Sequence, residues 1–188
     1  SYYFDGNGNL QTGWKKIDGL YYAFNSEGIM YADCRFYQNG NYYRADKQGA
    51  LLQNTWFKDE YYGEDAIGLM EFAKVNGKQY YFNQGKAVYS CYVADDGDKP
   101  KLYYADKSGI LSQVTQDGLY YAIDGSAYYA YFLQGGKLLA GTWKKVGNEY
   151  YYFSDGSYGY RYENSVDGKT YIFRTDGILM RGGWIHTR

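Results

Sequence analysis

Aromatic side chains are the residues of this sequence most able to bind a ligand. The 188 residues include 28 tyrosines, nine phenylalanines and four tryptophans. Each tryptophan follows a glycine at a spacing of six or seven residues, and the four are Trp14, Trp56, Trp143 and Trp184. Exposed rings on rigid turns stack against the C–H faces of hexoses. The structural alternative is that a tryptophan caps the apolar stripe between packed hairpins, with its indole N–H bonded to a carbonyl.

Catalytic and metal-binding groups are weaker candidates. A glycoside hydrolase needs two carboxylates across a cleft, but most of the aspartates stand in turns, where they shape the backbone. Two cysteines, Cys34 and Cys91, and the single histidine, His186, offer neither a disulfide framework nor metal-ligand spacing. We interpret both cysteines as structural residues at the aromatic position of their repeat. We therefore expect no catalytic residue, no metal site and no cofactor, and a chain that is not an enzyme by itself.

Charge and hydropathy exclude further classes of function. The chain has 20 lysines and arginines against 21 aspartates and glutamates. This balance gives no general attraction to phosphates, so we expect no nucleic-acid partner. We also expect no membrane span, because no run of about 18 apolar residues is present. The first residues, Ser1 to Phe4, lack the basic start and apolar stretch of a signal peptide, so we expect a fragment of a longer protein.

Tyrosine pairs reveal an internal repeat. Most intervals between successive pairs are near twenty residues, and a turn glycine follows each pair. This period predicts an array of nine or ten units. The pairs begin at Tyr2, Tyr21, Tyr42, Tyr61, Tyr80, Tyr103, Tyr120 and Tyr150.

Each unit has the pattern of a β-hairpin. In residues 18–30 a short aromatic strand is followed by a polar turn that ends at Gly28, which supplies the positive φ that such a turn needs. Adjacent strand residues face opposite sides, so one ring of each tyrosine pair must pack inward. A lone hairpin is marginally stable in water and must bury this face against the next one. We predict an all-β solenoid of stacked β-hairpin repeats of about 20 residues, forming a single array over residues 1–188.

Two stretches depart from the repeat. Residues 58–72 are acidic, and we predict that they include a short helical turn. Residues 122–136 are out of register with the other units, which indicates an insertion or a deletion. We interpret both as loops that interrupt the repeat, and not as linkers between separate domains, because hairpin patterns continue on both sides.

Three segments resemble a known family of repeats. Residues 12–30, TGWKKIDGLYYAFNSEGIM, and residues 141–156, GTWKKVGNEYYYFSDG, resemble the cell-wall-binding repeat family, and residues 167–177 with Gly183 and Trp184 are a partial third copy. This family comprises choline-binding modules of surface autolysins, with relatives in the glucan-binding domains of extracellular glucosyltransferases and in the receptor-binding repeats of large glucosylating toxins. The resemblance covers nearly the whole chain.

The resemblance implies aromatic sites between successive hairpins. In the choline-binding members, ring faces hold a quaternary ammonium, and each contributes about 0.5 to 2 kcal/mol of cation–π attraction. By this resemblance a tryptophan and the tyrosine seven residues later form two walls, and an aromatic residue of the next unit forms the third. The candidate ligand contacts are Trp14, Tyr21 and Phe36, then Trp143, Tyr150 and Tyr162, and finally Trp56 and Trp184.

Some units depart from the choline-binding pattern. The second wall is replaced by Gln79, Leu102 or Thr170 in other units. Residues 75–82 and 167–173 look more like the glucan-binding and toxin branches. The resemblance is therefore more specific about the fold and the broad role than about the ligand.

These observations predict a noncovalent binding module of a secreted or surface bacterial protein. Several weak sites along one array would attach the protein to a cell-wall polymer, such as a choline-bearing teichoic acid, or to an extracellular glycan. One alternative is a structural spacer or a protein-binding adhesin repeat that takes no small ligand and contacts a host or neighbouring surface. A second alternative is α-glucan binding.

Overall fold

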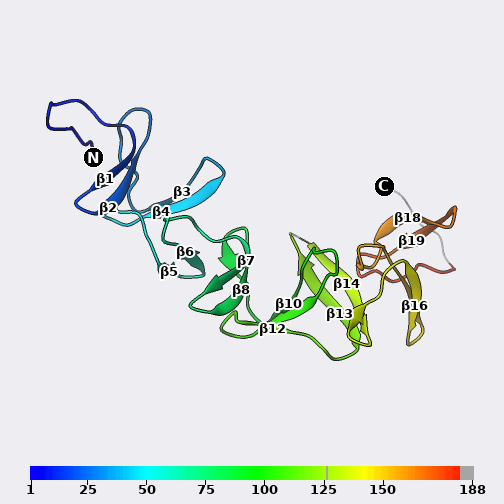
Figure 1. Cartoon of the computed structure of the whole chain (residues 1–188). Helices are drawn as coiled ribbons and strands as arrows, with labels where there is room; N and C mark the ends of the chain where they lie inside the picture. Colours follow the sequence, from blue (N-terminus) through cyan, green and yellow to red (C-terminus); the bar gives the residue numbers. More distant parts are fainter. Residues whose placement is uncertain (126, 183–188) are drawn as a thin grey trace. The chain divides into compact units, whose positions relative to one another are not determined.

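The computed structural model describes residues 1–125 and 127–182. All regular secondary structure in these residues is β-strand, which confirms the predicted all-β class. The chain divides into two compact units, residues Ser1–Val88 (unit 1) and Tyr89–Arg188 (unit 2), which are described separately. Figure 1 shows that unit 1 is built from small hairpins, whereas unit 2 combines a larger sheet with two hairpins.

Unit 1 contains four antiparallel hairpins in chain order. A further bridge joins Phe4 to Leu10 ahead of the first hairpin. The hairpins are β1 (Gly13–Ile17) with β2 (Leu20–Phe24), β3 (Cys34–Gln38) with β4 (Asn41–Ala45), β5 (Thr55–Phe57) with β6 (Glu60–Tyr62), and β7 (Glu71–Val75) with β8 (Lys78–Asn83), to which β9 (Lys86–Ala87) adds a third strand.

Unit 2 begins with a six-stranded sheet and ends with two hairpins. The sheet has the order β12-β11-β10-β13-β14-β15, and only the β10–β13 pair in it is parallel. Its strands are β10 (Cys91–Ala94), β11 (Leu102–Ala105), β12 (Leu111–Gln113), β13 (Gly118–Asp124), β14 (Ala127–Gln134) and β15 (Lys137–Leu138). The hairpins are β16 (Thr142–Val146) with β17 (Glu149–Phe153), and β18 (Tyr162–Val166) with β19 (Lys169–Phe173).

The two stretches that depart from the repeat both contain strands of hairpins. The predicted helical turn in residues 58–72 is wrong, because Glu60–Tyr62 is strand β6. Its acidic residue Glu60 is paired with arginines and buried, so it takes a core position despite its charge. The loop predicted in residues 122–136 is also wrong. This region holds most of the long β13–β14 hairpin, whose tyrosines have the high strand propensity that the irregular spacing obscured.

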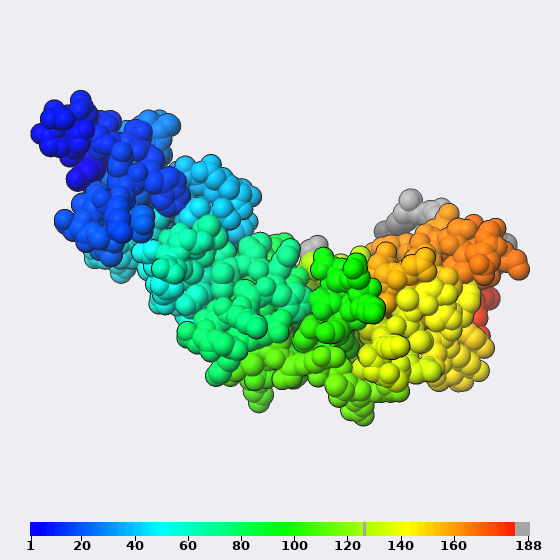
Figure 2. Space-filling view, viewed as in Figure 1, coloured from blue at the N-terminus to red at the C-terminus, as the bar shows by residue number. Residues whose placement is uncertain are grey.

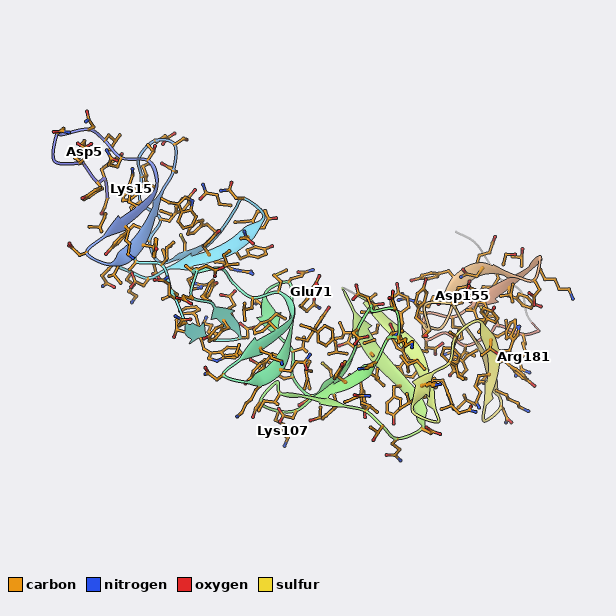
Figure 3. All side chains as sticks on the ribbon, in the orientation of Figure 1. Asp5, Lys15, Glu71, Lys107, Asp155 and Arg181 are labelled. Carbon is orange, nitrogen blue, oxygen red and sulfur yellow. The ribbon has the colours of Figure 1, made fainter. Side chains whose placement is uncertain are left out.

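A side-chain cap closes the turn of each regular unit. Asn25 Oδ1 accepts hydrogen bonds from the backbone N–H groups of Glu27 (3.0 Å) and Ile29 (2.9 Å). Gly28 then donates to the Asn25 carbonyl at 3.0 Å and has a φ of 76°, as predicted. The carboxylates of Asp5, Asp46 and Asp106 cap their turns in the same way, and Figure 3 shows Asp5 in the first turn.

Backbone hydrogen bonds connect successive hairpins within a unit. The segment that follows a turn donates an N–H to the aromatic strand of the preceding hairpin, as Leu51 does to the Tyr21 carbonyl and Gly68 to the Tyr42 carbonyl, both at 2.8 Å. In unit 2, Leu179 donates to the Tyr150 carbonyl, again at 2.8 Å. Figure 2 shows the hairpins of unit 1, coloured blue to green, packed against their neighbours in sequence.

The core of each unit combines large aromatic rings with smaller aliphatic side chains. Tyr43, Tyr62 and Tyr151 are the buried rings of their pairs, as predicted, and both Tyr80 and Tyr81 are buried. The prediction is wrong for the first pair, because Tyr2 and Tyr3 are both exposed. Phe82 and Phe153 are also fully buried. Ring burial of this kind supplies most of the favourable free energy in a fold whose separate hairpins have little stability.

Candidate aromatic binding sites

Trp56 lies at the centre of an aromatic cluster in unit 1. Its ring centroid is 5.3 Å from Tyr61, which stands opposite it across the β5–β6 hairpin. It is also 5.3 Å from Tyr80 of the next hairpin, and both tyrosines meet it nearly edge-on, at 69° and 64°. Phe82 lies beneath at 5.8 Å. Because Trp56 itself is 37% exposed, this cluster, here called the Trp56 cluster, presents aromatic surface to solvent.

Unit 2 repeats this arrangement around Trp143. Tyr152 stands opposite it across the β16–β17 hairpin at 5.2 Å, and Tyr171 of the next hairpin lies at 5.0 Å. The interplanar angles are 69° and 70°, and Phe173 lies beneath at 6.0 Å. This Trp143 cluster matches the Trp56 cluster to within 0.3 Å in every centroid distance. Two units of different sequence therefore build the same aromatic surface from the same positions.

The strand registers define these positions. The tryptophan is the second residue of the first strand, and a ring stands opposite it in the second strand. In the other hairpins this second position is held by Trp14, Arg35, Phe72, Tyr92, Leu119 and Glu163. The assignment of the cysteines to the aromatic position is therefore wrong, because Cys34 and Cys91 begin their strands one place earlier.

Tyr92 forms a third cluster that the sequence pattern did not reveal. Its ring lies 5.1 Å from Tyr104, opposite it on β11, and 5.0 Å from Tyr120 on β13. Tyr92 takes the place of tryptophan, while Tyr104 and Tyr120 correspond to the two flanking tyrosines. Residues 95–101 lengthen the turn between β10 and β11, so this unit does not keep the spacing of the others. The sequence feature that could have located this cluster is Cys91, the residue immediately before Tyr92.

The predicted residues of the first site lie near one another but differ in their contacts. Trp14 packs against Tyr43 at 4.6 Å and against Phe36 at 6.2 Å. The Phe36 ring is in turn stacked on Tyr31 at 4.2 Å. Tyr21 stands opposite Lys16, whose Nζ lies 5.0 Å from the centre of the Tyr21 ring. Phe36 is thus a contact of Trp14, and Tyr43 is a closer one that we did not predict.

The residues predicted for the second site, Trp143, Tyr150 and Tyr162, do not form one cluster. Tyr150 carries two cations of this chain, with Lys145 Nζ 5.6 Å and Arg181 Cζ 4.8 Å from its ring centre (Arg181 is labelled in Figure 3). The next-hairpin rings beside Trp143 are those of Tyr171 and Phe173. Tyr162 is instead 60% exposed and lies beside Arg161. Trp184, also predicted as a contact, lies outside the described residues.

An ion-pair cluster replaces the rings at one hairpin junction. Arg35 stands at the tryptophan position of β3, Arg44 is opposite it, and Glu60 of the next hairpin has the place that Tyr80 has in the Trp56 cluster. Glu60 is only 4% exposed, and its carboxylate lies 3.2 Å from Arg35 Nε and 3.1 Å from Arg44 Nε. Tyr62 donates a hydrogen bond to it at 2.7 Å. The protein's own charges fill this junction.

Burial beside Glu60 makes Tyr62 sensitive to alkaline pH. Burial, followed by its hydrogen bond to Glu60, raises the pKa of Tyr62 from 10.0 to about 12. Between about pH 10 and 12 the unfolded chain loses this proton while the folded chain keeps it, so the free energy of unfolding falls as pH rises. We expect Tyr62→Phe to reduce this decline, as measured by urea unfolding at pH 9 and pH 11. A decline equal to that of wild type, with the exposed Tyr37→Phe as control, would contradict this expectation.

The described residues contain no helix that could span a membrane and no group of three or more His, Cys, Asp or Glu residues that could hold a metal ion. The aromatic clusters offer stacking surface and tyrosine hydroxyl groups. Cations that the chain itself supplies lie instead against Tyr21 and Tyr150, which belong to none of the three clusters.

No family model matches the chain. It is 28% identical to Glucosyltransferase-S of Streptococcus mutans serotype c, in an alignment over 96% of this chain and 14% of that protein. It is 27% identical to Glucosyltransferase-I of Streptococcus downei, over 92% of this chain and 13% of that protein. Among solved structures, the choline-binding domain of CbpL from Streptococcus pneumoniae aligns with 97% of this chain and 93% of that one, at 22% identity and a TM-score of 0.47.

The two glucosyltransferases are relatives of a kind that the sequence resemblance named, and they confirm that resemblance. The chain spans only about one seventh of the length of the curated relatives that it matches.

Proposed function

We propose that this chain is a noncovalent glycan-binding module of a secreted or surface bacterial protein, and that the Trp56 and Trp143 clusters are its ligand sites. The observation that carries this proposal is the matched geometry of the two clusters. The packing of hairpins alone does not require an aromatic cluster, because the hairpins that meet at Glu60 are joined by ion pairs instead of rings. The streptococcal relatives support a role outside the cell.

Ring spacing favours a sugar over an enclosed quaternary ammonium. A cation is held against ring faces when it lies within about 6 Å of several ring centres. In both clusters, however, the rings already meet one another nearly edge-on at 5.0 to 5.3 Å, which is direct aromatic contact. A pyranose needs only an exposed aromatic face on which its C–H groups can stack.

The charges near the rings favour the same ligand class. Lys145 and Arg181 lie against the Tyr150 ring, and Lys16 lies against Tyr21, so the predicted second walls already carry cations. A choline group at Tyr21 or Tyr150 would be repelled by these charges, whereas sugar hydroxyls there accept hydrogen bonds from ammonium and guanidinium groups. We therefore assign an α-glucan or a similar neutral glycan as the leading ligand and place choline second.

We further propose that the hairpins of residues 1–188 act as one array of stacked repeats, a β-hairpin solenoid, with at least one site in each unit. Two weak sites on one chain raise the retention on a polymer through effective concentration, without any new contact. The chain itself acts by binding. The activity of the longer protein that carries it is a separate question, because the relatives extend far beyond the matched region.

Isothermal titration of the wild-type chain tests the ligand class. We expect saturable heat with isomaltooligosaccharides and none with choline at the same concentrations. If choline binds and this binding is lost in Trp56→Ala and Trp143→Ala, the assigned ligand becomes a wall polymer that bears choline instead of a glucan. If isomaltooligosaccharides, purified wall polymer and choline all give no heat, the binding proposal fails and a spacer or protein-binding role is left.

A further inference from the structure

Unit 2 contains a groove of about 290 Å³ that borders the Trp143 cluster, because its lining residue Tyr160 lies 5.1 Å from Tyr152 and 6.1 Å from Phe173 between ring centres. It lies between the start of β14 and the segment that links β17 to β18. Four tyrosines, one arginine and one asparagine give it both stacking faces and hydrogen-bonding groups. Its lining side chains include Tyr129, Tyr158, Tyr160, Arg161, Tyr162 and Asn164. A volume of this size is at the lower end of small-molecule sites and suits a ligand of one or two sugar rings.

Arg161 is held in a fixed position within this groove. Its Nη1 donates to the Tyr128 carbonyl at 3.0 Å and its Nη2 donates to the Tyr162 hydroxyl at 3.0 Å. The guanidinium carbon lies 5.0 Å from the ring centre of Tyr129 and 5.2 Å from that of Tyr162. Asn164 donates to the Arg161 carbonyl at 2.7 Å and fixes the backbone. The guanidinium is therefore placed before any ligand arrives.

The charge of Arg161 is not balanced within the groove. Among the described residues Arg161 forms no ion pair, and its buried Nε has no hydrogen-bond partner. The groove lining contains no carboxylate. A half-buried cation without a counter-ion is unfavourable, and a ligand that carries a negative charge would offset this cost.

Tyr162 adds a second unfavourable feature at the same place. Its φ is 61°, in the left-handed region that a bulky residue rarely adopts. The first residues of β1 and β7, Gly13 (68°) and Glu71 (53°), share this conformation, so the repeat imposes it and at β18 a tyrosine bears the strain. The strained tyrosine supplies both a ring wall and the hydroxyl that orients Arg161.

We infer that this groove, here called the Arg161 groove, binds an acidic pyranose, that is, a sugar ring that carries a carboxylate. The tyrosine rings stack on the C–H face of the sugar, Arg161 pairs with the carboxylate, and the tyrosine hydroxyls with Asn164 bind sugar hydroxyls. This site differs in ligand charge from the Trp56 and Trp143 clusters. Since Tyr160 of its lining also contacts the Trp143 cluster, both ligands are titrated in the test below.

An NMR titration of backbone amides tests this inference. Sodium glucuronate, methyl glucoside and sodium acetate are added to the wild-type chain at equal ionic strength. We expect glucuronate to shift the amide signals of Tyr129, Tyr162 and Asn164, with an affinity about tenfold or more above that of the other two probes. If methyl glucoside binds as tightly as glucuronate, the groove does not require an acidic ligand. If acetate binds as tightly as glucuronate, the groove does not require a sugar ring. Either result would overturn the inference.

Two variants separate binding from folding. Arg161→Met keeps the chain length of the side chain and is expected to weaken glucuronate binding about tenfold or more, whereas the exposed arginine variant Arg174→Met is the matched control. Tyr162→Gly relieves the left-handed strain, so its melting temperature is expected to equal or exceed that of wild type while glucuronate binding falls. Wild-type affinity in either Arg161→Met or Tyr162→Gly would refute the assignment. Isomaltooligosaccharide titration of the same variants shows whether the tryptophan clusters still bind.

Discussion

Glu60→Gln is expected to lower the free energy of unfolding of unit 1 by about 3 kcal/mol. Glutamine has nearly the same volume but no charge, so Arg35 and Arg44 lose the counter-ion that they share. Their side chains are only 24% and 18% exposed, and water therefore replaces the carboxylate incompletely. Tyr62 also loses a charged acceptor for its hydroxyl. Removing one partner of a buried ion pair lowers the free energy of unfolding by about 3 to 5 kcal/mol. Because the arginines are partly exposed, we expect a value at the lower end of this range.

Urea unfolding followed by near-ultraviolet circular dichroism measures the loss. Hydrogen exchange then locates it, because faster exchange is expected in the peptides that contain β3 to β6. Glu64→Gln, an exposed carboxylate of the same unit, is the control and is expected to change the unfolding free energy by less than about 0.5 kcal/mol. An equally small change in Glu60→Gln would mean that the ion-pair cluster does not stabilise this junction.

Loss of both tryptophan clusters is expected to abolish retention on an insoluble α-glucan. Trp56→Ala or Trp143→Ala alone removes the central stacking surface of one cluster and is expected to weaken binding about tenfold, which is typical of an aromatic residue at the centre of an interface. The double variant removes the site of each unit and with it the gain from two linked sites, so we expect a loss of about a hundredfold or more.

Matched variants distinguish lost contacts from lost folding. Trp56→Phe and Trp143→Phe keep an aromatic ring against the flanking tyrosines and are expected to retain part of the affinity. Tyr37→Ala removes a ring that is 63% exposed and belongs to neither cluster, and it is expected to bind as wild type does. Binding by the double alanine variant at wild-type strength, with an unchanged circular dichroism spectrum, would remove both clusters from the proposed function.

Local chemistry was enough to predict the repeating hairpins. A tyrosine-rich strand, a capping Asn or Asp and a glycine three residues later form a turn whose hydrogen bonds all lie within a few residues, as around Asn25 and Gly28. No contact with a residue distant in the sequence is needed to form this turn. The all-β class and the turn positions therefore follow from sequence alone. The same local rules failed at residues 58–72, because the burial of Glu60 depends on arginines from the preceding hairpin.

The composition of each aromatic cluster depends on contacts between hairpins. The tryptophan and the ring opposite it belong to one strand pair, but Tyr80 and Tyr171 come from the next hairpin and are selected by how the two pack. A register error of one residue turns a side chain to the other face, which is why Cys34 and Cys91 were assigned to the aromatic position in place of Arg35 and Tyr92.

The strand class, the period of the repeat and the tryptophans as candidate contacts can be predicted from the sequence, since they depend on side-chain type and short spacing. Packing between hairpins selects the rings that meet each tryptophan, replaces rings by charges at Glu60, and places Tyr162 beside Arg161. The physical reason is the range of the interactions involved. Hairpins form from bonds within about ten residues, whereas the sites form where side chains of successive hairpins pack together.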